Sequence, residues 1–267
     1  MLSEEFLYNF SSASIILILF FLILISNEIG YRLGTRATGG ANEALKSQTN
    51  AIQASVLGLL ALLLGFTFTM ALQRFDTRSQ AVVEESNAIG TAYLRTQLLP
   101  EPLHSETEAL FRQYVDLRLI ASKVDLTRED AWQELQGRIA NIQDQLWLNA
   151  LYAVNKDPSP VRTGLFVQAV NELIDAQGSR NGALKKHVPE VVLYLLFAVF
   201  ILGGGVLGYA CGLGGGRPWL ATISLFALIA LVVFIIVDLD RPRRGVIQVS
   251  QETMVELFES IKRPIER

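Results

Sequence analysis

The sequence has very little of the chemistry that enzymes and metalloproteins use. Its 267 residues include one cysteine, Cys211, and two histidines, His104 and His187. A single cysteine can form neither a disulfide nor a thiolate cluster within one chain, and we interpret Cys211 as a small apolar packing residue. The histidines stand in loop-like settings, where we expect solvated side chains rather than metal ligands. We therefore predict no metal site and no cofactor.

Catalytic motifs are also missing. The sequence contains no HExxH, GxSxG or P-loop pattern, so nothing in it supports a hydrolase or a kinase. An intramembrane enzyme would have no catalytic pair available. The net charge of −3 gives no reason to expect a nucleic-acid partner. We predict that the protein is not an enzyme and does not bind nucleic acid.

Apolar residues, in contrast, are abundant and clustered. They make up 51% of the chain, and charged residues make up 18%, where soluble domains carry nearer a quarter. A membrane-spanning helix needs roughly 20 consecutive apolar residues. Four stretches without Asp, Glu, Lys, Arg or His approach that length: residues 10–26, 51–72, 191–213 and 218–237. The first follows an acidic leader, MLSEEF, and no cleavage site comes directly after it, so we interpret it as a retained span rather than a signal peptide.

The distribution of Lys and Arg near the span ends predicts the orientation. With four spans, both termini and the connection 73–190 share one side, which carries Arg74, Arg78, Arg180, Lys185, Lys186, Arg241, Arg243 and Arg244. The other side carries Arg32, Arg36, Lys46 and Arg217. We expect the side with more positive charge to be cytoplasmic. The predicted organisation is spans one and two (1–72), a cytoplasmic helical domain (73–190), spans three and four (191–237) and a cytoplasmic tail (238–267).

The connection between spans two and three has helical patterns throughout. Residues 73–99 contain one Gly and no Pro, so the second span is predicted to continue to Leu99. From Ala51 such a helix would be about 74 Å long, more than twice the membrane core. The fold class we predict is all-α, a membrane protein with four transmembrane helices whose second helix extends into a helical cytoplasmic domain.

Further helix starts and faces can be placed in the same way. Ser105 with Glu108 resembles a capping box, and Thr127 with Asp130 marks another start. Amphipathic segments follow at 161–177 and 250–262. One apolar face is predicted after Thr127, formed by Trp132, Leu135, Ile139, Ile142 and Leu146.

The second span carries two patterned faces. Small residues at Ala54, Gly58, Ala61 and Gly65 are typical of close helix packing. On an adjoining face Gly58, Leu62 and Phe66 recur every four residues, followed by Thr69. Copies of this helix around an axis would stack apolar rings, the arrangement that gates ions by dewetting. A secondary transporter is disfavoured because the spans contain no ionisable residue.

Charged residues follow these apolar positions along the same helix. Arg74, Arg78, Glu84 and Glu85 could form a cytoplasmic vestibule that attracts ions of one sign, or simply the solvated face of a long helix. The arginines would favour anions and the glutamates would favour cations.

The stretch LLLGFTFTMALQRFDTR resembles the second-helix signature of the bestrophins, through Leu64, Gly65 and Phe66 followed by Arg74 and Phe75. The segments VVEESNAIGTAYLRTQLLP and DLDRPRRG are more closely similar to the bacterial bestrophin-like family. The resemblance implies a pentameric ion channel with four spans per subunit, cytoplasmic termini, and a neck lined by Gly58, Leu62 and Phe66.

The resemblance also bears on calcium. The acidic segment that binds calcium in animal bestrophins is reduced here to Asp238 and Asp240, beside Arg241, Arg243 and Arg244. Calcium requires six or more oxygen ligands, so we interpret these five residues as an ion-pair cluster at the membrane surface.

These observations favour a homo-oligomeric, pentameric ion channel in the bacterial inner membrane, with the lipid bilayer and inorganic ions as its partners. The alternative is a non-conducting scaffold or sensor whose cytoplasmic helices dock a partner protein. The amphipathic pattern between Thr127 and Val154 and the small-residue face of the second span motivate that alternative.

Overall fold

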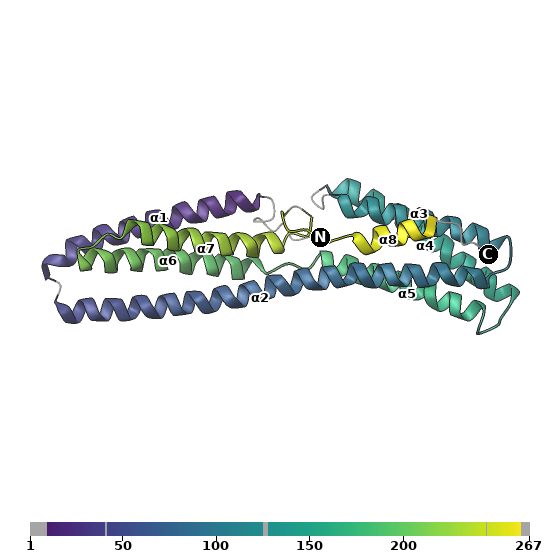
Figure 1. The fold of residues 1–267 in the computed structure, drawn as a ribbon, viewed down its shortest axis with the longest axis horizontal. Helices are drawn as coiled ribbons and strands as arrows, with labels where there is room; N and C mark the ends of the chain where they lie inside the picture. Colours follow the sequence, from purple (N-terminus) through teal and green to yellow (C-terminus); the bar gives the residue numbers. More distant parts are fainter. Residues whose placement is uncertain (1–9, 41, 125–127, 244, 263–267) are drawn as a thin grey trace. The chain divides into compact units, whose positions relative to one another are not determined.

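The computed structural model describes residues 10–40, 42–124, 128–243 and 245–262. Over these residues the chain is helical, without a strand, as Figure 1 shows. The helices are α1 (Ser12–Ala37), α2 (Glu43–Arg95), α3 (Leu103–Lys123), α4 (Glu129–Lys156), α5 (Thr163–Leu184), α6 (Glu190–Gly214), α7 (Trp219–Leu239) and α8 (Glu252–Lys262). Two 3₁₀ turns, η2 (Thr38–Gly40) and η3 (Thr96–Leu98), follow α1 and α2. The all-α prediction is confirmed.

The chain divides into two compact units. The first unit comprises Met1–Arg74 and His187–Arg241, and the second comprises Phe75–Lys186 and Pro242–Arg267. Helix α2 runs without interruption through 53 residues and contributes to both units. The predicted extension of the second span is therefore confirmed. It ends at Arg95 and the 3₁₀ turn that follows, slightly before the expected Leu99.

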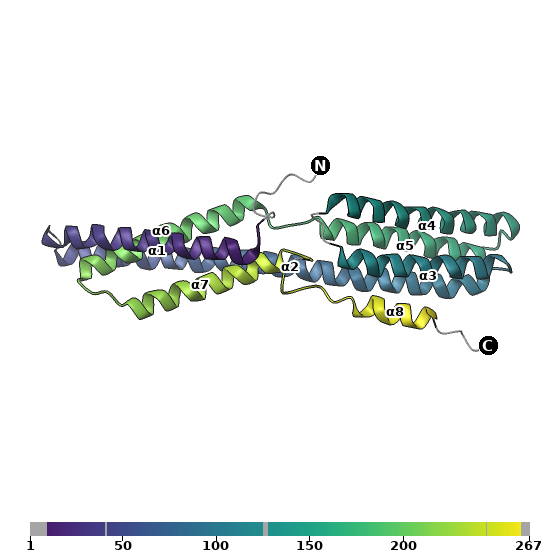
Figure 2. The same ribbon diagram turned by 90° about the horizontal axis from the view of Figure 1, so that it is seen from above.

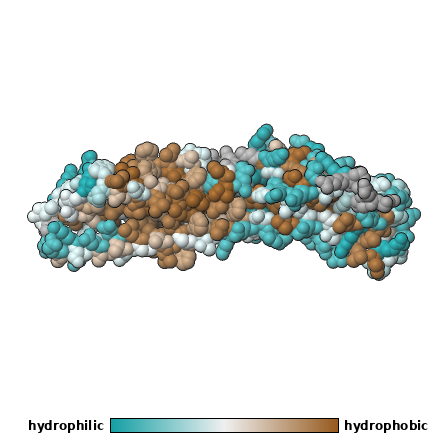
Figure 3. Space-filling model, viewed as in Figure 1, coloured by the Kyte–Doolittle hydropathy of each residue, from teal (hydrophilic) through white to brown (hydrophobic). Residues whose placement is uncertain are grey.

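The first unit contains the membrane-spanning helices. Four described helical stretches are long and apolar enough to cross a membrane: Ser12–Gly40, Glu43–Leu98, Glu190–Gly214 and Trp219–Leu239. Apolar surface gathers over α1, α2, α6 and α7 in Figure 3. Inside the unit, Ile23 of α1, Phe200 of α6 and Val233 of α7 are buried in a common core. The protein is a membrane protein with four transmembrane helices.

Helices α1 and α6 approach each other unusually closely. Gly30 and Gly34 of α1 lie against the backbone of α6, and Gly208 and Gly212 of α6 lie against the backbone of α1. The side-chain amide of Asn27 donates a hydrogen bond to the Gly204 carbonyl at 3.0 Å. The small-xxx-small packing of this chain is thus found between α1 and α6, where no side chain separates the two backbones.

The turn between α6 and α7 depends on glycine. Gly215 follows the last residue of α6 with a φ of 71°, in the left-handed region that favours residues without a Cβ. It ends the helix, and α7 begins after Pro218. Spans three and four are therefore joined by a tight glycine turn.

The second unit is a helical bundle of α3, α4, α5 and α8 with the C-terminal part of α2, as Figure 2 shows. Leu135, Ile139, Ile142 and Leu146 of α4 are buried in its core, and Trp132 packs against that core. This confirms the predicted apolar face. That face is used by the chain's own core, so it is not a surface for docking another protein.

Two helix boundaries, those of α3 and α5, differ from the expectation, and the start of α4 lies close to it. Helix α3 begins at Leu103, two residues before Ser105, and the Ser105 hydroxyl donates to the Glu101 carboxylate at 2.8 Å. Ser105 is therefore not the N-cap of this helix, and the predicted capping box was wrong. Helix α4 begins at Glu129 with Asp130 in its first turn, while Thr127 lies outside the described residues. Helix α5 continues to Leu184 because its polar-looking end buries one apolar side against the bundle.

Candidate functional site

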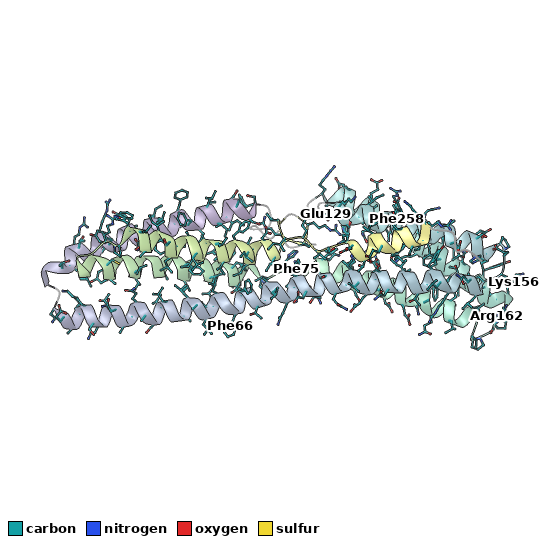
Figure 4. All side chains as sticks on the ribbon, viewed as in Figure 1. Phe66, Phe75, Glu129, Lys156, Arg162 and Phe258 are labelled. Carbon is teal, nitrogen blue, oxygen red and sulfur yellow. The ribbon has the colours of Figure 1, made fainter. Side chains whose placement is uncertain are left out.

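One face of α2 in the first unit is exposed in the described chain. Leu62 is 54% exposed and Phe66 is 63% exposed. Gly58 and Thr69 are also exposed, and no described atom lies within 4 Å of a Cβ placed at Gly58. Figure 4 shows Phe66 on the side of α2 that points away from α6 and α7. These are the four residues predicted to form the neck.

The opposite face of α2 accounts for this orientation. Leu60 is buried in the core of the first unit, and its side chain would meet a Cβ added at Gly203 of α6 at 2.8 Å. Val56 approaches the same glycine. With one face held against α6, the face that carries Leu62 and Phe66 is turned outward.

The small residues of α2 point outward as well. Ala54, Ala61 and Gly65 are exposed, and no described atom lies within 4 Å of a Cβ placed at Gly65. Among the described residues, Gly58 and Gly65 of this row make no close helix contact, whereas the glycines of α1 and α6 do. A role in packing for the row on α2 requires a second molecule, either another protein chain or lipid.

The hydroxyl of Thr69, at the end of the predicted neck, is hydrogen-bonded within its own helix. The Thr69 hydroxyl donates a hydrogen bond to the Gly65 carbonyl of the same helix at 2.9 Å. A threonine hydroxyl that bonds back to its own helix has its donor proton occupied. The outward face from Gly58 to Thr69 is therefore predominantly apolar.

The four charges predicted for a vestibule separate into two kinds. Glu84 is exposed and accepts a hydrogen bond from the Gln80 amide at 3.2 Å, while Arg74 is half-buried. Arg78 is 2% exposed and donates hydrogen bonds to the carbonyls of Ala183 and Lys186, at and just beyond the end of α5. A cation at the carboxyl end of a helix stabilises that end, so Arg78 is tied to the interior of the second unit.

Glu85 is also an interior group, and it forms a charged centre with two arginines. Its carboxylate is completely buried. Arg118 of α3 lies 2.6 Å from one carboxylate oxygen, and Arg180 of α5 lies 2.5 Å from the other. Gln251 accepts a further hydrogen bond from Arg180 at 2.7 Å. Two guanidiniums thus share one carboxylate, and we call Glu85, Arg118 and Arg180 the buried charge centre.

Tyr114 borders this centre. Burial raises the pKa of its phenol well above the usual range, and the Glu85 carboxylate adds to that shift. Burial, together with the charge of Arg118, lowers the pKa of Arg180 despite the Glu85 carboxylate, whereas in Arg118 the attraction of Glu85 and Tyr114 outweighs burial and raises the pKa. Arginine stays protonated in proteins, so the centre keeps two positive charges against one negative charge.

The segment after α7 lies partly inside the first unit. Asp238, Asp240 and Arg241 are buried. The Asp240 carboxylate accepts a hydrogen bond from the Val188 backbone at 3.0 Å, and His187 lies 3.5 Å from its other oxygen. Arg243 belongs to the second unit, where it donates to the Val124 carbonyl at 3.0 Å and stacks on Trp132. Arg244 lies outside the described residues.

The two histidines are not solvated loop residues, and that expectation was wrong. His104 is a buried residue of α3 whose Nδ1 lies 2.9 Å from the Thr96 carbonyl. His187 stands in a connection, but its side chain is largely buried beside Asp240. Within the described part of the chain, no cluster of three His, Cys, Asp or Glu residues could hold a metal ion.

Comparison with known proteins identifies the family. The profile of the Bestrophin-like domain matches residues 20–254, most of the chain. The chain belongs to the Bestrophin-like family.

Solved structures agree with this assignment. A point variant of a bacterial bestrophin homologue from Klebsiella pneumoniae has a TM-score of 0.63 and 16% identity to this bestrophin-like chain, covering 90% of it and 97% of the homologue. A second point variant of that homologue has a TM-score of 0.60 and 16% identity, covering 90% and 95% of the two chains. At this identity the similarity establishes the fold. No curated protein sequence matches the chain.

The buried charge centre is the part of this bestrophin-like chain that the sequence interpretation missed. Glu84 and Glu85 stand side by side and were treated as one pair. The helical repeat places the two glutamates on different faces of α2. Glu85 shares a face with Val82 and Ile89, both of which are buried. That periodicity was a signal that could have assigned Glu85 to the core.

Proposed function

We propose that this chain is one subunit of a homo-oligomeric ion channel in which α2 lines the pore. Membership of the Bestrophin-like family supports channel activity. The observation that carries the proposal is the outward face of α2, where Leu62 and Phe66 are more than half exposed. One helix face cannot enclose a pore, so copies of the subunit must surround a common axis, as in cyclic oligomers.

The neck of this channel is a stack of apolar rings. Phe66 and Leu62 of each copy form the two bulky rings, and Gly58 forms a wider level because it has no side chain. A narrow apolar ring excludes water and therefore ions until it widens. The neck accordingly acts as the gate.

The charges that follow the neck favour cations. Residues 18 positions apart lie about five turns apart on the same face of an α-helix. Glu84 has this relation to Phe66, and Gln80 has it to Leu62, and all four residues are exposed. Arg78 and Glu85 are committed to the interior of the second unit. A ring of Glu84 carboxylates would therefore set a negative potential beyond the gate.

The orientation we propose places both termini and the second unit in the cytoplasm of a bacterial cell, in its inner membrane. Lys and Arg predominate on that side of the spans, which is the bias that sets topology. The pentameric assembly is proposed from the resemblance to the bestrophins.

Planar-bilayer recording of the purified protein tests the pore. We expect the wild type to pass single-channel currents, and the Leu62→Ala, Phe66→Ala double variant to be open for a larger fraction of the time, because smaller rings are wetted more easily. The matched control is Leu228→Ala, which truncates an exposed leucine of α7 rather than of α2. Silence of both the wild type and the double variant would refute the channel.

One of the two observations that motivated the scaffold alternative no longer supports it. The amphipathic face of α4 is buried within the second unit. The small residues of α2 remain outward, and oligomerisation of the channel uses them equally well. A protein that is silent in bilayers and elutes as a monomer would restore the scaffold interpretation.

A further inference from the structure

The second unit contains a cleft that the channel mechanism does not use. Its volume is about 580 Å³, and it is lined by α2, α3, α5 and the stretch from Pro242 to Val255 that leads into α8. Drug-sized and metabolite-sized ligands occupy sites of about 300–1,000 Å³. The cleft is therefore large enough for a small solute, and its walls come from four separate parts of the chain.

Positive charge predominates around this cleft. Its basic lining residues are Arg78, Lys123, Arg180 and Arg243. None of the described residues that line it is an Asp or a Glu. The carboxylate that pairs with Arg180 is that of Glu85, which also pairs with Arg118. The described wall of the cleft thus presents cationic side chains and no carboxylate to a ligand.

The cationic groups are held in place rather than free to swing into solvent. Arg78 is fixed by the carbonyls of Ala183 and Lys186. Arg180 is fixed by Glu85 and Gln251. Arg243 is fixed from the other wall by the Val124 carbonyl and by stacking on Trp132. Donors that are already ordered lose little entropy when a ligand binds.

Polar groups of matching chemistry lie between these cations. Ser250 and Gln248 line the same cleft: the Ser250 hydroxyl accepts a hydrogen bond from the Glu252 backbone and can still donate its own proton, and the Gln248 amide donates one of its two hydrogens to the Gly245 carbonyl. Arginine forks and hydroxyl donors suit the tetrahedral oxygens of a phosphoryl group, which accept several charge-assisted hydrogen bonds at once. A single chloride ion would leave most of these donors and most of the volume unused.

We propose that this cleft binds a phosphoryl anion, either on a small phosphorylated solute or on the headgroup of an anionic lipid. The site joins the pore helix α2 to α3, α5 and the segment before α8, so its ligand would stabilise the second unit. The inference is independent of ion conduction, because binding and stability can be measured on protein that passes no current.

Calorimetric titration of the full-length protein in detergent with inorganic pyrophosphate tests the proposal, in a chloride buffer of matched ionic strength. We expect saturable binding of one pyrophosphate per subunit. The Lys123→Gln, Arg243→Gln double variant should weaken binding by about tenfold or more. The control is Arg112→Gln, which removes an exposed cation of α3 that is paired with Glu108 outside the cleft; it should bind as the wild type does.

A second measurement needs no variant and so does not depend on folding. Pyrophosphate should slow acetylation of Lys123, read by mass spectrometry, and leave Lys156 of α4 unchanged. Competition by dihexanoyl phosphatidylglycerol would assign the ligand to lipid headgroups, and failure of that lipid to compete would assign it to soluble phosphates. Absence of pyrophosphate binding, equal weakening by Arg112→Gln, or unprotected Lys123 would overturn the proposal.

Discussion

Glu85 shows how much one side chain contributes when its charge is buried. The carboxylate lies between Arg118 and Arg180, at 2.6 Å and 2.5 Å, and it has no contact with solvent. A buried ion pair is weak support for stability as a whole, but removal of one partner leaves the other charge uncompensated. Here the removal of one carboxylate would leave two guanidiniums together.

We therefore expect Glu85→Gln to destabilise the second unit by about 3–5 kcal/mol, the usual cost of breaking a buried pair. The matched control is Glu84→Gln, the exposed neighbour on the same helix, which should change stability by less than about 0.5 kcal/mol. Thermal unfolding of the purified protein followed by circular dichroism measures both. Equal midpoints for the two variants would show that the centre contributes nothing.

The contrast between these two glutamates also shows what the sequence could and could not tell. Glu85 shares a helical face with Val82 and Ile89, a spacing that the sequence alone contains, and both of these residues are buried. The partners of Glu85 could not be found in that way, because Arg118 and Arg180 lie 33 and 95 residues away in the chain. Local periodicity assigns a face, whereas the identity of the residue across from it depends on tertiary packing.

At the scale of elements, the structure shows small-residue packing in a helix pair, α1 and α6, that the sequence analysis did not single out. Gly204, Gly208 and Gly212 recur every four residues in α6 and meet α1. The similar row on α2, around Gly58 and Gly65, is exposed. Both rows satisfy the small-xxx-small pattern. The sequence could not tell them apart, because the pattern does not specify which helix, or which molecule, the small face meets.

Contact with α1 predicts different effects for a glycine-to-alanine substitution at two places in α6. Gly208→Ala places a Cβ against the Asn27 backbone and should cost about 1–3 kcal/mol by overpacking. Gly214→Ala has no described atom within 4 Å of its Cβ and should be neutral or slightly stabilising, because alanine favours helix.

The lone cysteine offers a direct readout of that comparison. Cys211 lies in the same helix, partly buried. A fluorogenic maleimide should label it at a lower temperature in Gly208→Ala than in the wild type, whereas Gly214→Ala should follow the wild type. Identical melting of the two variants would mean that α1 and α6 can separate without loss of stability.

At the scale of the whole molecule, the long helix α2 joins the membrane-spanning part of the subunit to its helical bundle. The four spans, the uninterrupted α2 and the bundle could all be predicted from the sequence, since they depend on run length and helical period. The face of α2 that would meet the axis of the proposed channel could not be predicted so directly, because the predicted neck and the small-residue row overlap at Gly58. Burial of Leu60 against α6 now favours the face of Leu62 and Phe66.

The same face predicts the selectivity of the channel. Glu84 is exposed on the face of Phe66, so a ring of these carboxylates should attract cations, and the wild type should show a cation-selective reversal potential under a KCl gradient. Glu84→Gln removes the ring and should move that potential toward zero. Glu106→Gln, which removes an exposed carboxylate of α3, should leave it unchanged. An anion-selective wild type, or an unaltered potential in Glu84→Gln, would show that another face of α2 lines the pore.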